Sequence, residues 1–413
     1  MARTKVVFIG AAGEMCRVAI EQFALAPGGR ELVLTDIRPE SLEPLARKLP
    51  AGRASVHRLD LFDDQALRKL VGDAALVVLG AGPYIRTSAP VIEACLEAKV
   101  PYLDFDDDVE STEHALSLDQ KARAAGVPVY VGCGASPGMS NVLAVDAASD
   151  LDTVDVIDLC WLVGDERPAV GRAVLEHLLH ISAGDCLTWE QGRQVVHETF
   201  VETGTFPILA GAADVLLYET AHPEPVTLPR RYPGARRIRC VGGLDPAPLN
   251  GLARGMGLAV QEGRMTAREA VDFIEDVVKG GPGSAKGWRN TLRGMAGQVR
   301  RGECGPTEMA RFLAMSALRR TYPYRGGLLA QVYGTRNGKP AVSARRTRMR
   351  PHGALNNMGG VTGTACAAFA LLALADPERK GAFAPEDWAD PAAFYQALEQ
   401  VGVARHEIVE TVA

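Results

Sequence analysis

Residues 5–26, KVVFIGAAGEMCRVAIEQFALA, join an apolar run to a helical period through a glycine-containing turn. The run VVFIG is typical of a strand buried on both faces, and CRVAIEQFALA has apolar residues at helical spacing. Gly10 to Met15 are therefore predicted to form a strand-to-helix turn. Glycines in such a turn let the backbone approach a pyrophosphate, and the helix N-terminus offers amide groups to it.

The glycine pattern of this turn departs from the usual dinucleotide-binding motif. Gly10 and Gly13 form a G-x-x-G arrangement, Ala12 takes the place of the second glycine, and Cys16 takes the helix-packing position. By itself the motif fits a structural turn as well as a phosphate site. The residues that we expect to touch a cofactor here are Gly10, Ala12, Gly13, Glu14 and Met15.

The next strand supplies a second signal for a dinucleotide. The segment ELVLTD ends at Asp36, at about the distance where an acidic residue bonds the adenosine ribose. A carboxylate there repels a 2′-phosphate, so NAD is favoured, while Arg38 keeps NADP possible. Asp60, after the third strand, is expected either to bond the adenine or to cap the following helix. Strands and helices alternate up to ALVVLG, which predicts a parallel sheet of roughly six strands.

The composition is that of a large globular protein. Its 413 residues are 47% hydrophobic and 23% charged, which allows two or more domains. The formal charge of −5 gives no field that would attract nucleic acid or a membrane surface. We find no run of about 18 uncharged apolar residues and no signal-like region, and so expect a cytoplasmic protein. The eight scattered cysteines are predicted to be reduced core thiols, and no metal ligand set is evident.

Three later turns are expected at the carboxyl edge of the sheet, where open parallel sheets bind ligands. Gly82, Pro83 and Tyr84 follow ALVVLG, and the acidic stretch DFDDDVEST follows the next strand. In this stretch Asp104 and Asp106 are candidate contacts for a cationic amine, whereas Asp107 and Asp108 are interpreted as a solvated loop. The third turn, before a helix, contains Ser136, Pro137 and Gly138. These three residues, with Gly82 and Pro83, are expected to contact the cofactor.

The motifs GPY (residues 82–84) and SPGMSN (residues 136–141) resemble those of the saccharopine dehydrogenase superfamily, in which a PPY-like turn precedes a DPG-x-[ST]-N element. Ser136 replaces the usual Asp, as in the lysine 6-dehydrogenase-like branch. HPEPVTLPRRYPG from His222, RCVGGLDP from Arg239 and VTGTACAAFALLALAD from Val361 extend the resemblance.

The resemblance implies an α/β protein of three parts. Residues 1–145 would form a Rossmann dinucleotide-binding domain, residues 146–352 an α+β substrate and dimerisation domain, and residues 353–413 a helical return to the Rossmann domain. A helical insertion at about 252–322 is less well covered by the resemblance; its capping box, Thr266 with Glu269, predicts a helix start. We expect this insertion to be ordinary packing, with an active-site cover or a dimer interface as alternatives. Asn337-Gly338 predicts a hairpin.

The activity implied is NAD(P)-dependent oxidoreduction at a carbon–nitrogen bond of an amino acid or polyamine, in a homodimer. Oxidative deamination of a lysine-like amine is the first form; reductive condensation of an aldehyde or keto acid with an amine is the second. A sensor that binds NAD(H) without turnover is the third. Asp104, His222 and Tyr84 are the candidate catalytic residues, with Glu224 beside them. His177 and His180 share a helix face and are interpreted as a half-buried structural pair, with substrate or metal binding as the alternative.

Overall fold

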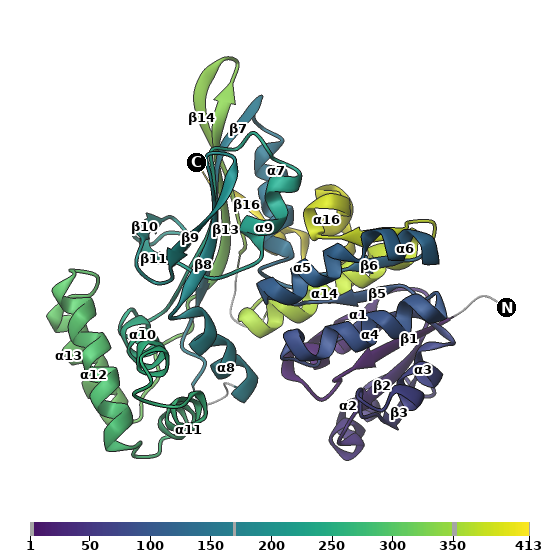
Figure 1. Ribbon diagram of the computed structural model, residues 1–413, viewed down its shortest axis with the longest axis horizontal. Helices are drawn as coiled ribbons and strands as arrows, with labels where there is room; N and C mark the ends of the chain where they lie inside the picture. Colours follow the sequence, from purple (N-terminus) through teal and green to yellow (C-terminus); the bar gives the residue numbers. More distant parts are fainter. Residues whose placement is uncertain (1–3, 168–170, 349–352, 413) are drawn as a thin grey trace.

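The structure is a computed structural model that describes residues 4–167, 171–348 and 353–412. It is an α/β protein in which a parallel sheet and a larger mixed sheet lie side by side, with a helical layer at the far side of the second sheet (Figure 1). The boundary expected between residues 352 and 353 adjoins residues outside those described. The other expected boundary, after residue 145, falls inside a continuous helix, α7 (Met139–Ala148).

The first sheet has seven parallel strands in the order β15-β6-β5-β4-β1-β2-β3. These strands are β1 (Lys5–Ile9), β2 (Glu31–Asp36), β3 (Ala54–Arg58), β4 (Ala74–Leu79), β5 (Tyr102–Asp104), β6 (Pro128–Tyr130) and β15 (Gly381–Phe383). The connecting helices are α1 (Glu14–Leu25), η1 (Pro39–Leu42), α2 (Glu43–Lys48), α3 (Asp64–Val71), α4 (Tyr84–Ala98), α5 (Val109–Ser117) and α6 (Asp119–Ala125). Val6 to Ile9 are at most 2% exposed, because helices cover both faces of a parallel sheet. The expected Rossmann sheet is confirmed.

The second sheet has nine strands, with β10-β11-β12-β7-β13-β14-β16 in order and β8 and β9 joined to β12. They are β7 (Thr153–Val163), β8 (Asp185–Glu190), β9 (Arg193–Glu198), β10 (Thr203–Phe206), β11 (Val215–Glu219), β12 (Arg237–Leu244), β13 (Gly327–Arg336), β14 (Lys339–Arg346) and β16 (Glu410–Val412). β13 and β14 form the predicted hairpin, in which Asn337 and Gly338 have φ values of 52° and 70°. Helix α7 packs on β13 and β14 and joins this sheet to the Rossmann domain.

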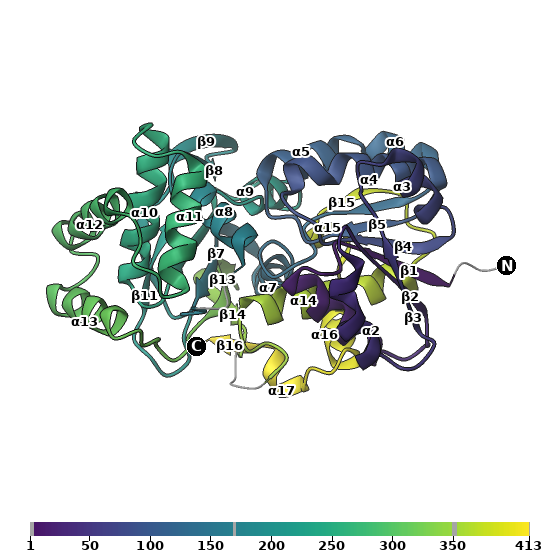
Figure 2. The ribbon, with the colours of Figure 1, turned by 90° about the horizontal axis from the view of Figure 1, so that it is seen from below.

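A layer of helices covers one end of the second sheet and has a hydrophobic core of its own. It contains α8 (Arg172–Ile181), α10 (Pro248–Gln261), α11 (Ala267–Val278), α12 (Ala285–Arg300) and α13 (Pro306–Ala317), while the short α9 (Glu224–Thr227) and η2 (Leu228–Arg230) lie nearer the Rossmann domain. The capping box at the start of α11 is confirmed, since Thr266 Oγ1 accepts from the Glu269 amide at 3.1 Å. In both ribbon views α8 lies between this layer and the Rossmann domain (Figures 1 and 2).

The C-terminal segment returns to the Rossmann domain. It contains α14 (Met358–Ala375), α15 (Pro385–Trp388), α16 (Pro391–Gln400) and α17 (Arg405–Ile408), and it adds β15 to the edge of the parallel sheet. α14 packs closely on α1: a Cβ on Gly363 would lie 2.5 Å from the Met15 carbonyl oxygen.

Helix α14 also corrects one prediction. Within the described ranges, it is the one helix long and apolar enough to cross a membrane by length and composition, so the expectation that no such run occurs was wrong. In the structure 67% of it is buried, which is typical of the core helix of a globular domain.

Candidate functional site

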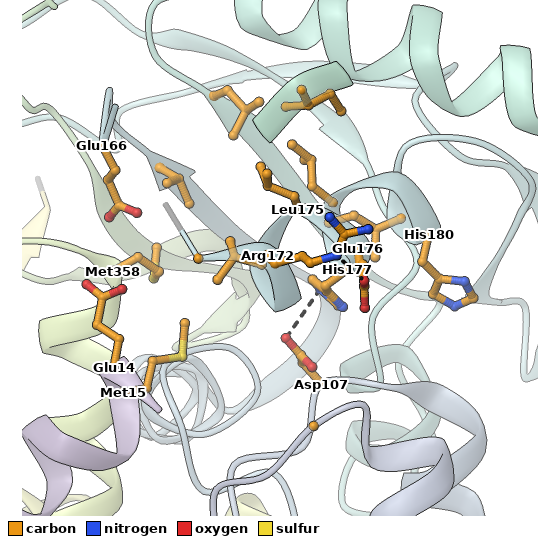
Figure 3. A pocket seen from close by; sticks show the side chains of 18 of the residues that line it. Glu14, Met15, Asp107, Glu166, Arg172, Leu175, Glu176, His177, His180 and Met358 are labelled. Carbon is orange, nitrogen blue, oxygen red and sulfur yellow. Dashed lines mark ion pairs between the residues drawn. The ribbon is translucent and has the colours of Figure 1, made fainter. Parts of the chain in front are cut away.

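A cavity of about 840 Å³ lies between the Rossmann domain and the second domain. From the first domain, residues that follow β1, β2, β4, β5 and β6 line it, all at the carboxyl edge of the parallel sheet. From the second domain, β7, α8 and the helices α10 to α13 line it, with Met358 and Thr362 of α14 between the two sides. Figure 3 shows this cavity with part of its lining drawn as sticks.

The turn after β1 has a backbone conformation, fixed by hydrogen bonds, that lets a ligand approach the backbone closely. Gly10 has a φ of 78°, and a Cβ there would lie 2.6 Å from the Cβ of Ala81, so a side chain is excluded. The Ala12 amide donates to Asp36 Oδ2 at 3.2 Å, and the Arg38 amide donates to Asp36 Oδ1 at 3.0 Å. Asp36 thus connects the turn to the end of β2.

The same turn fits the pyrophosphate of a dinucleotide. The first amides of α1 lack intrahelical partners and lie at the cavity wall, where Gly13 provides no side chain that would keep a phosphate away. These residues would therefore hold a nicotinamide dinucleotide at this edge of the sheet.

The structure divides the predicted site residues into two groups. Those that line the cavity are Gly13, Glu14, Met15, Arg38, Gly82, Pro83, Tyr84, Ser136 and His222. Those that support the wall from behind or lie outside it are Gly10, Ala12, Asp36, Asp60, Asp104, Pro137 and Gly138. Asp60 is exposed and accepts a hydrogen bond from the Phe62 amide at 3.0 Å. The expectation that it caps the following helix was wrong, because Asp63 is the N-cap of α3.

Asp104 does not face the cavity, contrary to the expected substrate contact. It is 0% exposed, and its carboxylate accepts from the Tyr102 hydroxyl at 2.6 Å and from the Gly132 amide at 2.8 Å. Burial raises its pKa to about 6. Asp106 is also buried and accepts from the Asp108 amide at 2.8 Å. Both carboxylates therefore brace the loop that follows β5.

Asp107, interpreted from the sequence as a solvated residue, instead forms the cavity wall. His177 Nε2 of α8 lies 3.3 Å from Asp107 Oδ2 (Figure 3). His177 Nδ1 lies 3.7 Å from Asp108 Oδ1. Burial works against the charged ring, but the two carboxylates outweigh it and raise the pKa of His177. His180 of the same helix is exposed, so the two histidines are not a structural pair.

His222 and Glu224 form a buried pair beside this ion pair. His222 Nδ1 lies 3.5 Å from Glu224 Oε2, and the His222 ring makes an edge contact with His177 at 5.8 Å between centroids. Glu224 also accepts from the hydroxyls of Ser136 and Ser140. Burial opposes ionisation of Glu224, but His222 and then Ser136 favour it and keep the pKa of Glu224 below its ordinary value.

Tyr84 begins α4 and is 6% exposed. Its ring packs edge-on against Phe105, and its hydroxyl has no hydrogen-bond partner among the described residues. A buried hydroxyl without a partner at a cavity wall fits a site whose ligand supplies the missing bond.

Glu166 is a site residue that the sequence analysis missed. It follows β7, and its carboxylate lies at the same end of the cavity as Glu14 (Figure 3). Burial and then the charge of Glu14 raise the pKa of Glu166 to about 7. No motif surrounds Glu166, so only its place in the fold distinguishes it from a surface glutamate.

The cysteines and the possible metal ligands are the last groups for which the sequence made a prediction. All eight cysteines are free and buried, as predicted. His177, Asp107 and Asp108 bring possible ligand atoms within 4.8 Å of one another, a cluster that the sequence did not indicate. The expectation that the protein holds no metal stays a prediction.

The turn, the acidic strand end and the cavity at the sheet edge define a protein that binds a nicotinamide dinucleotide. Residues 6–129 match the family described as saccharopine dehydrogenase NADP binding domain. This match lies within the part of the chain for which the sequence predicted a dinucleotide-binding domain of that superfamily.

Curated relatives and a solved structure are also similar to this chain. A carboxynorspermidine synthase of Vibrio cholerae is 26% identical over 253 residues, which are 56% of this chain and 58% of that protein. A carboxyaminopropylagmatine dehydrogenase of Synechocystis is 26% identical over 37% of this chain and 41% of that protein. The chain thus spans less than two thirds of these relatives. The apo saccharopine dehydrogenase (L-Glu forming) of Saccharomyces cerevisiae, with a TM-score of 0.63 and 14% identity over 99% of this chain and 100% of that one, has the same fold.

Proposed function

We propose that the protein is an NAD(P)-dependent oxidoreductase that acts at a carbon–nitrogen bond of an amine or amino acid. The observation that carries this proposal is the Asp107–His177 pair in the cavity wall, beside the expected position of the nicotinamide. A carboxylate there attracts the positive charge of an ammonium or iminium nitrogen. When bound, the nicotinamide would accept or donate the hydride.

The protein's own residues would bind, orient and exchange protons. Asp107 would hold the ammonium or iminium nitrogen of the substrate. His177, 3.3 Å from Asp107, would set how strongly that carboxylate attracts the nitrogen. His222 would exchange the proton of the reacting amine, since its Nδ1 faces Glu224 and leaves the opposite ring nitrogen for the substrate. Glu224, 3.5 Å from His222 Nδ1, would hold the His222 ring in place. Tyr84, with its unpartnered hydroxyl, would donate a hydrogen bond to the ligand.

Reductive condensation of a carbonyl compound with an amine is the favoured direction. The names carboxynorspermidine synthase and carboxyaminopropylagmatine dehydrogenase, borne by two relatives, support this form of the chemistry. Oxidative deamination stays as the second candidate, because Ser136 replaces the aspartate that is usual in the superfamily.

One experiment separates these functions and the sensor hypothesis. Isothermal titration would first measure the affinities for NAD and NADP. Absorbance of the reduced nicotinamide would then be followed in two screens, one with amines alone and the oxidised cofactor, the other with amine and carbonyl pairs and the reduced cofactor. Oxidation of the reduced cofactor that requires both partners supports condensation, and cofactor reduction by an amine alone supports deamination. Cofactor binding without turnover in either screen would overturn the proposed enzyme in favour of a sensor.

A further inference from the structure

The cavity continues past His177 into the helical layer, where its wall is almost wholly apolar. Among the lining residues that α10 to α13 contribute, Ser316 is the one polar side chain. Its apolar walls include Leu249, Leu252, Ile274, Val277, Trp288 and Leu313. We call this part of the cavity the apolar chamber.

The charged groups at the mouth of the apolar chamber are already paired within the protein. Arg167 donates to Asp165 at 2.7 Å and to Ser316 at 3.3 Å. Arg172 donates to Asp272 and Glu275 at 2.7 and 2.8 Å. No charged lining residue comes from α10 to α13. A second ammonium group, as in a polyamine, would therefore meet no opposite charge inside the chamber.

The helices around the apolar chamber are tightly packed, so the chamber does not arise from a loosely packed layer. Beneath it, α10 and α12 approach so closely that a Cβ on Gly255 would lie 2.5 Å from the Asn290 carbonyl oxygen. Met256 and Phe273, at 0% and 3% exposed, fill the core of the layer. Protein interiors are packed as densely as organic crystals, so an open apolar space beside a well-packed layer is typical of a ligand pocket.

We infer that the substrate carries an extended apolar group, alkyl or aryl, which occupies the apolar chamber while its reacting nitrogen lies at Asp107 and His177. For the reacting nitrogen of the substrate, the inference rests on the proposed function. For the apolar group of the substrate, it rests on the helices that line the chamber. It gives α10 to α13 a role in substrate selection.

The first test measures chain-length dependence of binding. Butylamine, hexylamine and octylamine would be titrated calorimetrically into the NAD-saturated protein, with spermidine as the polyamine comparator. Burial of each methylene is expected to tighten binding about fourfold. A shift of tryptophan emission to shorter wavelength on binding of octylamine, lost in Trp288→Phe, would place the chain in the chamber. Equal affinity across the series, or tighter binding of spermidine than of octylamine, would overturn the inference.

Two variants test the chamber itself. Leu313→Lys places a charge in its wall and is expected to remove the chain-length dependence, whereas Val277→Phe fills part of it and is expected to weaken octylamine more than butylamine. Leu318→Lys, just past α13 and 66% exposed, is the matched control for the added charge. Thermal unfolding and NAD affinity show whether each variant folds. Unchanged chain-length dependence in two folded chamber variants contradicts the inference.

The result also separates the inference from the proposed function. Chain-length-dependent binding without turnover in either cofactor screen would retain the apolar chamber and reject the enzyme. Turnover of amines without chain-length dependence would retain the enzyme and reject the chamber.

Discussion

His177 of α8 and Asp107, which follows β5, form an ion pair of 3.3 Å across the boundary between the two domains. His177 also faces Asp108 and touches the ring of His222. The pair therefore joins three segments that are far apart in the sequence. It places a carboxylate and a titratable ring where the substrate nitrogen is proposed to lie.

We expect this pair to make stability depend on pH. The two carboxylates raise the pKa of His177 in the folded protein above the ordinary value of about 6.5. The charged ring is thus favoured by folding: its contribution is fully present below about 6.5 and is lost as pH rises through the raised pKa. Melting temperatures of the parent and His177→Gln should differ most at low pH and converge at high pH. His114→Gln, at an exposed histidine of α5 away from the cavity, is the control; a parent–variant difference that grows with pH would contradict the assignment.

Cofactor preference is expected to depend on the charge of Asp36. The parent should bind NAD more tightly than NADP, because the carboxylate repels a 2′-phosphate. Asp36→Asn keeps an oxygen acceptor for the Ala12 amide but removes the charge, and should narrow the gap by about tenfold. Titration calorimetry with both cofactors measures this. Arg38→Ala should weaken NADP alone, and a parent that prefers NADP would show that the interpretation of Asp36 is wrong.

Substitutions of Gly10 and Gly13 by valine are expected to have different effects on stability and cofactor affinity. Gly10→Val should lower the melting temperature as well as cofactor affinity, since its φ is 78° and its Cβ would overlap Ala81. Gly13→Val should fold, because Gly13 has an ordinary φ of −62° and a Cβ there would lie 3.2 Å from its nearest neighbour, the Gly10 carbonyl oxygen, which must move only slightly. It should lose affinity because Gly13 lines the cavity.

Thermal unfolding and titration of NAD separate these effects. Gly305→Val, where a Cβ would meet nothing within 4 Å, is the matched control. Full affinity for NAD in a folded Gly13→Val protein would place the dinucleotide elsewhere.

Substitutions of Asp107 and Asp104 are expected to differ in their effect on kcat/KM. Asp107→Asn and His222→Ala should each lower kcat/KM for the best amine by about a hundredfold or more, as is usual for removal of a general acid or base or of a charge at the reacting centre. Asp104→Asn should lower the melting temperature, because Tyr102 and Gly132 lose a charged acceptor, with a smaller effect on kcat/KM. A folded Asp107→Asn protein within threefold of the parent would reject the proposed site.

Local pattern was enough to predict much of the fold. The turn from Gly10 to Met15, the acidic end of β2 and the Asn337-Gly338 hairpin each depend on neighbours close in the chain. Backbone conformation and apolar periodicity are local properties, so such elements can be read from the residues themselves. The sequence also indicated the carboxyl edge of the sheet as the place of the site, because parallel strands bring their ends together.

Tertiary structure decided which side chains act there. DFDDDV contains four aspartates that are chemically alike, yet packing buries Asp104 behind the wall and places Asp107 beside His177. Likewise, apolar residues of α10 to α13 have the periodicity of ordinary core helices, and only their position over the cavity makes them a chamber. The burial of a side chain and its hydrogen-bond or ion-pair partners arise from contacts between segments distant in the sequence. The sequence by itself determines the helices and strands and their order along the chain.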